Sequence, residues 1–150
     1  LRRRALVALA EISGEQFEPT LEAWSRWHVR TTSWWSGERQ RFLDVARNGK
    51  PSAASRAIQE LAMLRAYRHE LVDGLAAVLE RSEVELVVLA TASLGHLGSM
   101  DAIPHLVSQL EVKNVDVRRA AYYALRRMTG ENYSDDPEAW RAAGWGAVSR

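Results

Sequence analysis

Apolar residues recur along the chain at helical spacing, in segments separated by polar and glycine-containing stretches. In the clearest segment the apolar positions fall three or four residues apart, which places them on one stripe of a helix. That stripe consists of Val117, Ala121, Ala124, Leu125 and Met128. No segment alternates apolar and polar residues for long enough to indicate a strand. The pattern therefore predicts an all-α chain.

The helical segments repeat at a constant interval along the sequence. This interval equals the distance in sequence from position 86 to position 117. The apolar pairs that coincide are Leu86 with Val117, Ala90 with Ala121, Leu94 with Leu125, Leu97 with Met128, Leu75 with Leu106 and Leu79 with Leu110. A weaker third copy sets Ile58 and Met63 on Leu89 and Leu94. Two helices per repeat of this length predict an α-solenoid, whose units bury their apolar faces against their neighbours. The residues expected to be buried are Leu75, Leu79, Leu89, Leu94, Leu106, Leu110, Ala121 and Leu125.

Polar residues and glycines mark the expected helix ends. Ser82 with Glu85 three residues later has the spacing of a capping box at the start of a long helix. Asn114 is expected to cap the next long helix, and Asp101 the short helix between them. The glycines expected to end the long helices in the left-handed conformation are Gly98 and Gly130.

Residues 94–106 read LGHLGSMDAIPHL and are followed at residues 117–121 by VRRAA. This combination resembles bacterial HEAT repeats of the phycobilisome-lyase type, and the resemblance extends over residues 52–130. The resemblance implies stacked helical pairs and, for function, a scaffold that binds other proteins. A chromophore-lyase-type subunit is an alternative that rests on the repeat type alone.

A second, longer-range repeat relates the two ends of the chain, so that position 1 corresponds to position 117. Residues 1–24 align without gaps on residues 117–140, and 10 of the 24 positions are identical. Each copy predicts a long helix, a glycine cap, an aromatic residue and a tryptophan. These aromatic pairs are Phe17 with Trp24 and Tyr133 with Trp140. We expect each pair to close the exposed end of the apolar core as a clasp; an aromatic ligand cage is the alternative.

The repeats divide the chain into three parts. Residues 1–28 are expected to be the end of a preceding HEAT-like array with its clasp, and residues 29–40 a connector. Residues 41–150 are expected to form a second array with its own C-terminal clasp. Because the first array lacks its earlier helices and the chain does not begin with Met, we expect the native protein to continue upstream.

The amino-acid composition excludes several classes of protein and site. Hydrophobic residues make up 47% and charged residues 26%, which is typical of a globular domain. Twenty Lys and Arg against 19 Asp and Glu give a net charge of +1, so no overall field attracts nucleic acid or membranes. The chain has no cysteine, which excludes disulfides, thiol nucleophiles and cysteine-based zinc sites. Without a membrane span or a signal core we expect a cytoplasmic location, unless a signal peptide lies upstream.

Catalytic motifs are missing from the sequence. The four histidines lack the HExxH spacing of a metal site, and the serines lack the GxSxG elbow of a hydrolase. No glycine-rich phosphate loop is present. We therefore expect no catalytic, cofactor-binding or metal-binding residues, no cofactor and no enzymatic activity.

The remaining candidate for function is a surface, because the long helices of a solenoid line one face of the array. Their expected outward positions form three rows at the same interval: Arg56, Val87 and Arg118; Glu60, Thr91 and Tyr122; Leu64, Gly95 and Arg126. Arginine and tyrosine are enriched at binding hot spots. The Arg118–Tyr122–Arg126 side of its helix predicts contacts with carboxylates and mixed protein surfaces. The alternative is that these are ordinary solvated residues.

Trp34 and Trp35 are a second candidate, because two adjacent residues of a helix cannot both face one core. Residues 33–35 are also similar to a stretch in HEAT-like DNA glycosylases, and the acidic residue that follows is Glu38. Basic runs at residues 2–4, 118–119 and 126–127 favour nucleic-acid binding, whereas the balanced total charge argues against it. We expect the partner to be another protein.

Overall fold

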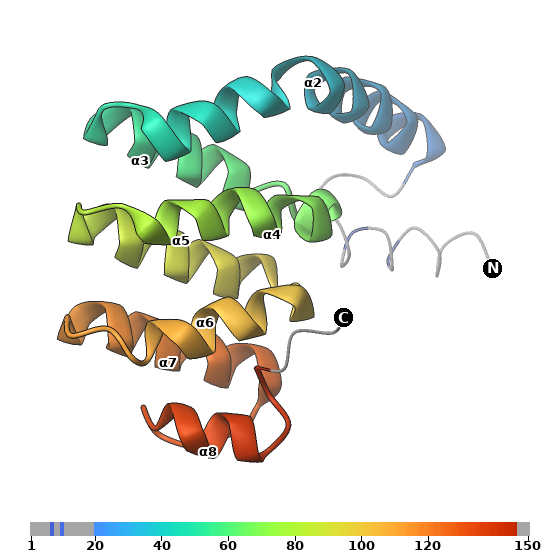
Figure 1. Ribbon diagram of the computed structural model, residues 1–150. Helices are drawn as coiled ribbons and strands as arrows, with labels where there is room; N and C mark the ends of the chain where they lie inside the picture. The colour runs from blue at the N-terminus through green and yellow to red at the C-terminus, as the bar shows by residue number, and fades with distance from the viewer. Residues whose placement is uncertain (1–6, 8–9, 11–19, 147–150) are drawn as a thin grey trace.

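The computed structural model describes residues 7, 10 and 20–146 of the chain, and every regular element among residues 20–146 is helical. In chain order, with η for a 3₁₀ helix, the elements are α2 (Leu21–Asn48), α3 (Pro51–Ala62), η1 (Arg65–Tyr67), α4 (Arg68–Ala76), η2 (Ala77–Glu80), α5 (Val84–Leu97), η3 (Met100–Ala102), α6 (Ile103–Gln109), α7 (Val115–Thr129) and α8 (Pro137–Ala142). The helices are stacked from α2 and α3 at one end to α8 at the other (Figure 1). The predicted all-α solenoid is confirmed.

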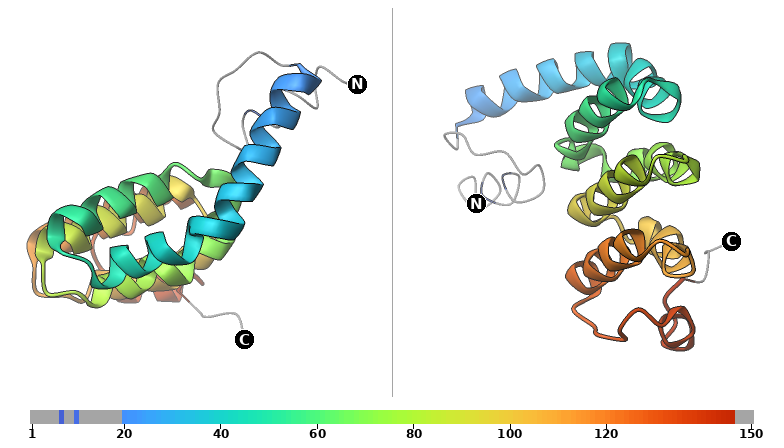
Figure 2. Two further views of the ribbon diagram at one scale, coloured as in Figure 1. Left: turned by 90° about the horizontal axis from the view of Figure 1, so that it is seen from above. Right: turned by 90° about the vertical axis from the view of Figure 1, so that its left-hand side faces the viewer.

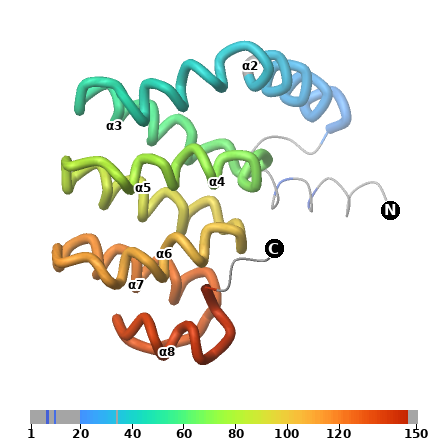
Figure 3. The backbone as a smooth tube through the Cα atoms, viewed as in Figure 1, coloured from blue at the N-terminus to red at the C-terminus, as the bar shows by residue number. Residues whose placement is uncertain are grey.

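The stack has two layers, which appear as two columns when the helices are viewed end-on (Figure 2, right). One layer contains α3, α5 and α7, and successive helices within it are in contact. The other contains the C-terminal half of α2 with α4, α6 and α8, and the backbone passes back and forth between the layers (Figure 3). Each helical pair therefore buries its apolar side against the pairs before and after it.

Helix α2 is longer than the helices of the stack and comprises 28 residues. Its C-terminal half packs on α3 and α4, whereas its N-terminal half projects beyond the stack (Figure 2, left). Thr20 caps it by accepting a hydrogen bond from the backbone N–H of Ala23 at 3.2 Å. The expected connector, residues 29–40, is helical throughout. Its role as a boundary between two arrays stays a prediction.

The core contains most of the leucines that the sequence pattern placed there. The side chains with at most 3% exposure include Leu75, Leu94, Leu106, Leu110, Ala121 and Leu125. The prediction is wrong for Leu79 and Leu89, which are only partly buried. Leu79 lies in η2, where three residues per turn bring Val78 rather than Leu79 beneath Leu75. Leu89 lies at the edge of α5, beside a surface groove.

The register predicted for the third copy is also wrong. Met63 is 68% exposed, whereas Leu94, its expected equivalent, is fully buried. Helix α3 begins at Pro51, α5 at Val84 and α7 at Val115, so the first of these two intervals is longer than the second by two residues. The residue equivalent to Leu94 is therefore Leu61, which is fully buried. The difference arises because the connection from α3 to α5 is longer than that from α5 to α7.

Helices α5 and α7 approach each other most closely at Gly95. A methyl group on Gly95 would lie 2.6 Å from the Cβ of Ala124, which is closer than carbon atoms pack. Val87 and Thr91 precede Gly95 at four-residue intervals and are buried, with 6% and 0% exposure. The Thr91 hydroxyl donates to the Val87 carbonyl at 2.7 Å, so its burial leaves no unpaired donor. We call Val87, Thr91 and Gly95 the stacking stripe of α5.

The helix ends confirm part of the predicted capping. Gly98 and Gly130 end α5 and α7 with φ angles of 70° and 78°, in the left-handed region. Asn114 caps α7 and accepts hydrogen bonds from the backbone N–H groups of Asp116 and Val117. Asparagine and glycine thus adopt, at the ends of the long helices, the capping conformations that each residue type favours locally.

The two other predicted caps are wrong. The N-cap of α5 is Glu83, and the Ser82 hydroxyl donates to its carboxylate at 3.3 Å instead of forming a capping box. Asp101 lies inside η3, and its carboxylate accepts a hydrogen bond from Ser99 at 3.0 Å. The Asp101 carboxylate also lies 2.7 Å from Nδ1 of His69, a tertiary contact that local spacing does not encode, whereas the Glu83 carboxylate binds Arg81, two residues earlier in the chain.

The C-terminal end of the stack is closed by an aromatic clasp. Trp140 on α8 is fully buried, and its indole N–H donates to the carbonyl of Ser134 at 3.0 Å. The ring of Tyr133 meets the Trp140 ring edge-on with centroids 5.0 Å apart. Helix α8 packs on α6, so the clasp covers the end of that layer. The predicted clasp is confirmed for this copy, and its full burial leaves no room for a ligand cage around Trp140.

For the N-terminal copy the structure describes one half of the aromatic pair. Trp24 is 6% exposed, and its ring contacts the Trp27 ring edge-on at 5.4 Å. Phe17 lies outside the described residues. The N-terminal clasp stays a prediction.

Replacing Leu125 by alanine should lower the free energy of unfolding by about 2–5 kcal/mol, because the side chain is fully buried and its loss leaves a cavity. The exposed Met63 is the control, and Met63→Ala should change stability by no more than about 0.5 kcal/mol. Urea unfolding followed by circular dichroism measures both values. Equal losses in the two variants would contradict the register described above.

Trp140→Ala should lower the free energy of unfolding by about 3–5 kcal/mol, because it removes the largest side chain of the clasp. Trp140→Phe should lose less, since it keeps an aromatic ring against Tyr133 and gives up the hydrogen bond to Ser134. Thermal unfolding of the two variants beside the parent chain tests the clasp. An unchanged melting temperature in Trp140→Ala would show that the clasp does not stabilise the stack.

Candidate functional site

The row Arg118, Tyr122 and Arg126, predicted to bind a partner, lies at the C-terminal end of the α3–α5–α7 layer. In the repeat these residues correspond to the stacking stripe of α5, and they are the same stripe on α7. On α5 the stripe lies beneath α7, whereas within residues 20–146 no later helix of this layer follows α7. The row therefore faces the end of the stack rather than one of its sides.

The segment that follows α7 covers part of this stripe. The Tyr122 hydroxyl donates to the side-chain oxygen of Asn132 at 2.9 Å. Arg118 donates to the backbone carbonyls of Val112 and Lys113 at 2.9 and 2.8 Å, and its guanidinium lies 3.9 Å from the Asp135 carboxylate. Both side chains are thus engaged in holding the chain around α7. Arg126 is exposed, and its part in binding stays a prediction.

The predicted outward orientation of Val87, Thr91 and Gly95 is wrong, because all three are buried and Gly95 packs against Ala124 of α7. Leu64 is also misplaced, since it follows the end of α3 and packs against the core. The physical reason is the angle of about 100° between consecutive residues of a helix. A stripe predicted one residue out of phase faces a neighbouring helix instead of solvent.

Arg56 and Glu60 are exposed on α3, as predicted, but they are not equivalent to Val87 and Thr91. They line an open groove of about 420 Å³ between α2 and α3. Its apolar wall is formed by Phe42, Val45, Ala53 and Ala57, and its other lining residues are Glu38 and Arg41. Helices α2 and α3, which line this groove, lie at the other end of the stack from α7, which carries Arg126, so the predicted rows do not form one surface (Figure 1).

Trp35 is partly buried and stacks on Tyr67, with ring centroids 4.1 Å apart and an angle of 8° between the planes. The guanidinium of Arg39 lies 5.0 Å from the centre of the Trp35 ring, within the range of a cation–π contact. The side chain of Trp34 lies outside the described residues. Glu38, the acidic residue of the glycosylase-like stretch, forms an ion pair with Arg41 at 3.3 Å.

The solvent side of the α3–α5–α7 layer, which we call the outer face, lies one residue away from the predicted rows: one residue later on α5 and α7, and one residue earlier on α3. In equivalent positions of the three helices it carries Pro51, Val84 and Val115; Ser52, Glu85 and Asp116; Ser55, Val88 and Arg119; Gln59, Ala92 and Tyr123. Among these, Val84, Val115 and Tyr123 are large apolar side chains with 39%, 59% and 58% exposure. These positions recur at the same four-residue spacing as the rows that the sequence predicted. The spacing alone therefore did not indicate which side of each helix faces solvent.

The outer face is hollowed by a shallow groove of about 680 Å³, which we call the outer groove. Its lining comes from all three helices and consists of Ser55, Gln59, Val84, Glu85, Val88, Leu89, Ala92, Asp116, Arg119, Ala120 and Tyr123. A second depression, toward the start of α3, shares Ser55, Val84 and Glu85 with it and adds Glu83. Together they form a continuous, mainly apolar hollow across the first turns of the layer.

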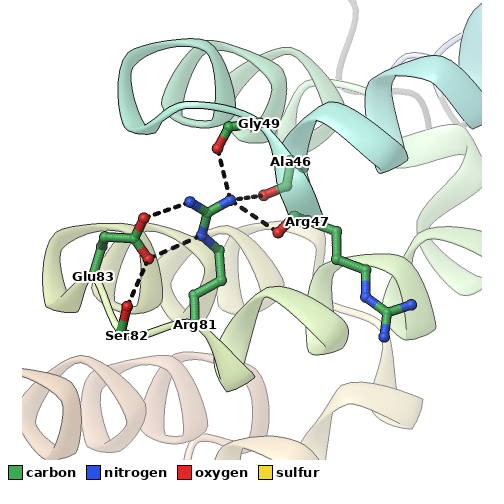
Figure 4. A network of polar contacts seen from close by, with 6 residues as sticks. All are labelled: Ala46, Arg47, Gly49, Arg81, Ser82 and Glu83. Carbon is green, nitrogen blue, oxygen red and sulfur yellow. Dashed lines mark hydrogen bonds and ion pairs between the residues drawn. The ribbon is translucent and has the colours of Figure 1, made fainter.

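Arg81 joins the end of α2 to Glu83 (Figure 4), which lines the second depression. Its guanidinium donates to the carbonyls of Ala46, Arg47 and Gly49 at 2.9–3.3 Å, where the last carbonyls of α2 need donors. The same group donates twice to the Glu83 carboxylate, at 2.5 and 3.2 Å. The Arg81 side chain is only 12% exposed, so the network is sheltered from water on that side.

The pairing with Arg81 determines the charge state of Glu83. Hydrogen bonds from Arg81, with that of the Glu83 backbone, lower the pKa of the carboxyl from 4.5 to about 2. The pKa of Arg81 is raised by the same hydrogen bond. Glu83 is therefore ionised at any pH near neutrality, and its charge is matched by Arg81.

Two other charged residues in the outer groove also form an ion pair. Arg119 binds the Asp116 carboxylate three residues earlier on α7. Glu85 on α5, in contrast, makes no ion pair among the described residues and is exposed. The groove therefore presents one carboxylate without an opposite charge in contact with it.

Ser99, His69 and Asp101 come together between α4 and η3, a juxtaposition that the sequence analysis missed. The His69 Nδ1 atom lies 2.7 Å from the Asp101 carboxylate and 3.1 Å from the Ser99 hydroxyl. A hydrolase triad needs the serine and the acid on different ring nitrogens, whereas here both meet Nδ1. Ser99 is also fully buried. The cluster joins two repeats and lowers the pKa of Asp101 through hydrogen bonds from His69 and Ser99.

Other chemistry-bearing groups are dispersed. His96 is partly buried, and burial, with the charges of Arg127 and Arg65, lowers its pKa. Within the described ranges no three His, Asp or Glu side chains are grouped so that they could hold a metal ion. In that same part of the chain, no helix combines the length and apolar character required to cross a bilayer.

The HEAT-repeat family matches residues 40–126, which is more than half of the chain. The chain belongs to this family. The match covers the last part of α2, all of α3 to α6 and most of α7, which build most of the two-layer stack. No curated protein and no solved structure matches the chain. HEAT repeats are commonly protein-interaction scaffolds, and the family is typically non-enzymatic.

Glu83→Gln should remove a stabilising contribution that depends on pH. The contribution is complete above pH 4.5, the ordinary pKa, and is lost as the pH falls through about 2, the pKa in the fold. The melting temperature of the parent chain should therefore exceed that of Glu83→Gln at pH 6, and the gap should close toward pH 2. Thermal unfolding of both proteins between pH 2 and 6 measures the gap. A gap independent of pH would contradict the Arg81–Glu83 pairing.

Proposed function

We propose that this chain is a non-catalytic scaffold or adaptor that binds another protein through the outer face of α3, α5 and α7. The observation that carries the proposal is the outer groove, a mainly apolar hollow lined by all three helices. Exposed apolar surface bordered by polar residues is typical of protein-binding sites. The partner-binding role of Arg56, Glu60, Arg126 and Trp35 remains a secondary proposal for the ends of the stack.

Rigidity supports this choice of surface. The three helices that line the groove are held from behind by the buried stacking stripe and by α4 and α6. A face whose backbone is already ordered loses little conformational entropy when a partner binds. Tyr123, which is 58% exposed, supplies a large aromatic side chain of the kind found at hot spots.

Nucleic acid is the weaker alternative. Of the basic run at residues 118–119, Arg118 is held by two carbonyls and Asp135, and Arg119 by Asp116. Binding to phosphates requires several free cations on one surface. We also propose a cytoplasmic location and a repeat of the bacterial phycobilisome-lyase type, both on the sequence alone.

Photo-crosslinking from single positions tests the proposed surface. A benzoylphenylalanine at position 123, in the outer groove, should form an adduct with a partner protein in cells of the source organism. The matched control is position 100, where Met100 is 50% exposed and lies in η3, outside the lining of the outer groove. A third probe at position 126 tests the end of the stack. Circular dichroism confirms that each variant is folded.

An adduct at position 123 and none at position 100 supports the outer face. Adducts at position 126 without one at position 123 would move the binding site to the end of the stack. Equal yields at positions 123 and 100, or none at any position, would contradict the proposed surface.

A further inference from the structure

The charges of the outer groove indicate what kind of segment it receives, which deepens the proposed function and rests on it. Three carboxylates and one guanidinium contribute to the two connected hollows: Glu83, Glu85, Asp116 and Arg119. Glu83 is paired with Arg81, and Asp116 with Arg119. The remaining charge is that of Glu85. The N-termini of α3, α5 and α7 add only partial positive charge beside the hollow, whereas Glu85 carries the one full charge of the lining that has no opposite charge in contact with it.

An acidic partner finds no available cation in this groove. The lining contains one cation, Arg119, and it is already bound by Asp116. A carboxylate placed there would be desolvated beside Glu85 without an opposite charge to compensate. A basic side chain has two places to bind, the Glu85 carboxylate and the aromatic ring of Tyr123, a residue that is 58% exposed.

The apolar part of the groove requires apolar side chains on the same segment. Val84, Val88 and Ala92 lie along α5 beside Glu85, at the centre of the outer face. Neighbouring packed helices lie about 8–10 Å apart, so a segment that crosses from α3 to α7 spans about 20 Å. A helix covers that distance with about 13 residues.

We propose that the outer groove binds a short, basic amphipathic segment of a partner protein, with its apolar side on α5 and a lysine or arginine on Glu85. A basic segment has the opposite charge to the acidic partner that the Arg118–Tyr122–Arg126 row suggested. Those arginines lie on the stacking stripe at the end of the layer, outside the groove.

Two synthetic peptides, each just long enough to cross the groove as a helix, test the proposal directly. Both form a helix with leucine on one side, and one carries lysine and arginine where the other carries glutamate. Fluorescence anisotropy with the full chain measures their affinities at low salt. The basic peptide should bind at least about tenfold more tightly, and added salt should reduce the difference.

The decisive variant is Glu85→Lys, with Glu70→Lys as its matched control. Both glutamates are exposed and lie in the first turn of their helices, so each change has the same effect on helix stability. Glu70 lies on α4, in the other layer. Glu85→Lys should lower the affinity for the basic peptide about tenfold, whereas Glu70→Lys should leave that affinity unchanged. Equal effects of the two variants, or tighter binding of the acidic peptide, would overturn the proposal.

The same variants separate this inference from the proposed function. If a cellular partner crosslinks at position 123 and Glu85→Lys leaves its yield unchanged, the basic segment is refuted while the scaffold remains. If no partner crosslinks at position 123, the binding surface itself is refuted. Crosslinking at position 123 that is lost in Glu85→Lys and kept in Glu70→Lys supports both.

Discussion

Helices α5 and α7 lie so close at Gly95 that a methyl group there would collide with Ala124. This contact requires a small residue at the Gly95 position, and α3 has Ala62, which is also buried, at the equivalent position. Close packing brings many atoms into contact and gives the stack its stability. It also orients each helix about its axis, and thereby decides which residues reach solvent.

The two ends of the stack follow from the same constraint. On α7 the stripe carries Arg118 and Tyr122, whose size and polarity are incompatible with another closely packed helix. A polar loop and the clasp around Trp140 occupy that end instead, with hydrogen bonds to Tyr122 and Trp140. Residues that looked like a binding motif are thus explained by the need to end a repeat array.

Electrostatic pairing organises what remains on the outer face. Arg81 satisfies the last carbonyls of α2 and binds Glu83, so one side chain both ends a helix and joins it to the next repeat. Arg119 neutralises Asp116 in the same way within α7. Because these pairs are complete in themselves, the unpaired carboxylate of Glu85 becomes the feature that distinguishes one possible partner from another.

The amino-acid sequence by itself determined the helices, their repetition, the caps at Asn114 and Gly98, and the aromatic clasp. These features depend on spacing and on preferences that act within a few residues. Only the tertiary structure decided the two-residue longer interval before α5 and the true phase of the outer face. An error of one residue turns a side chain by about 100°, and nothing local distinguishes Val87 from Val88. The neighbouring helix does, because it buries one and leaves the other at the groove.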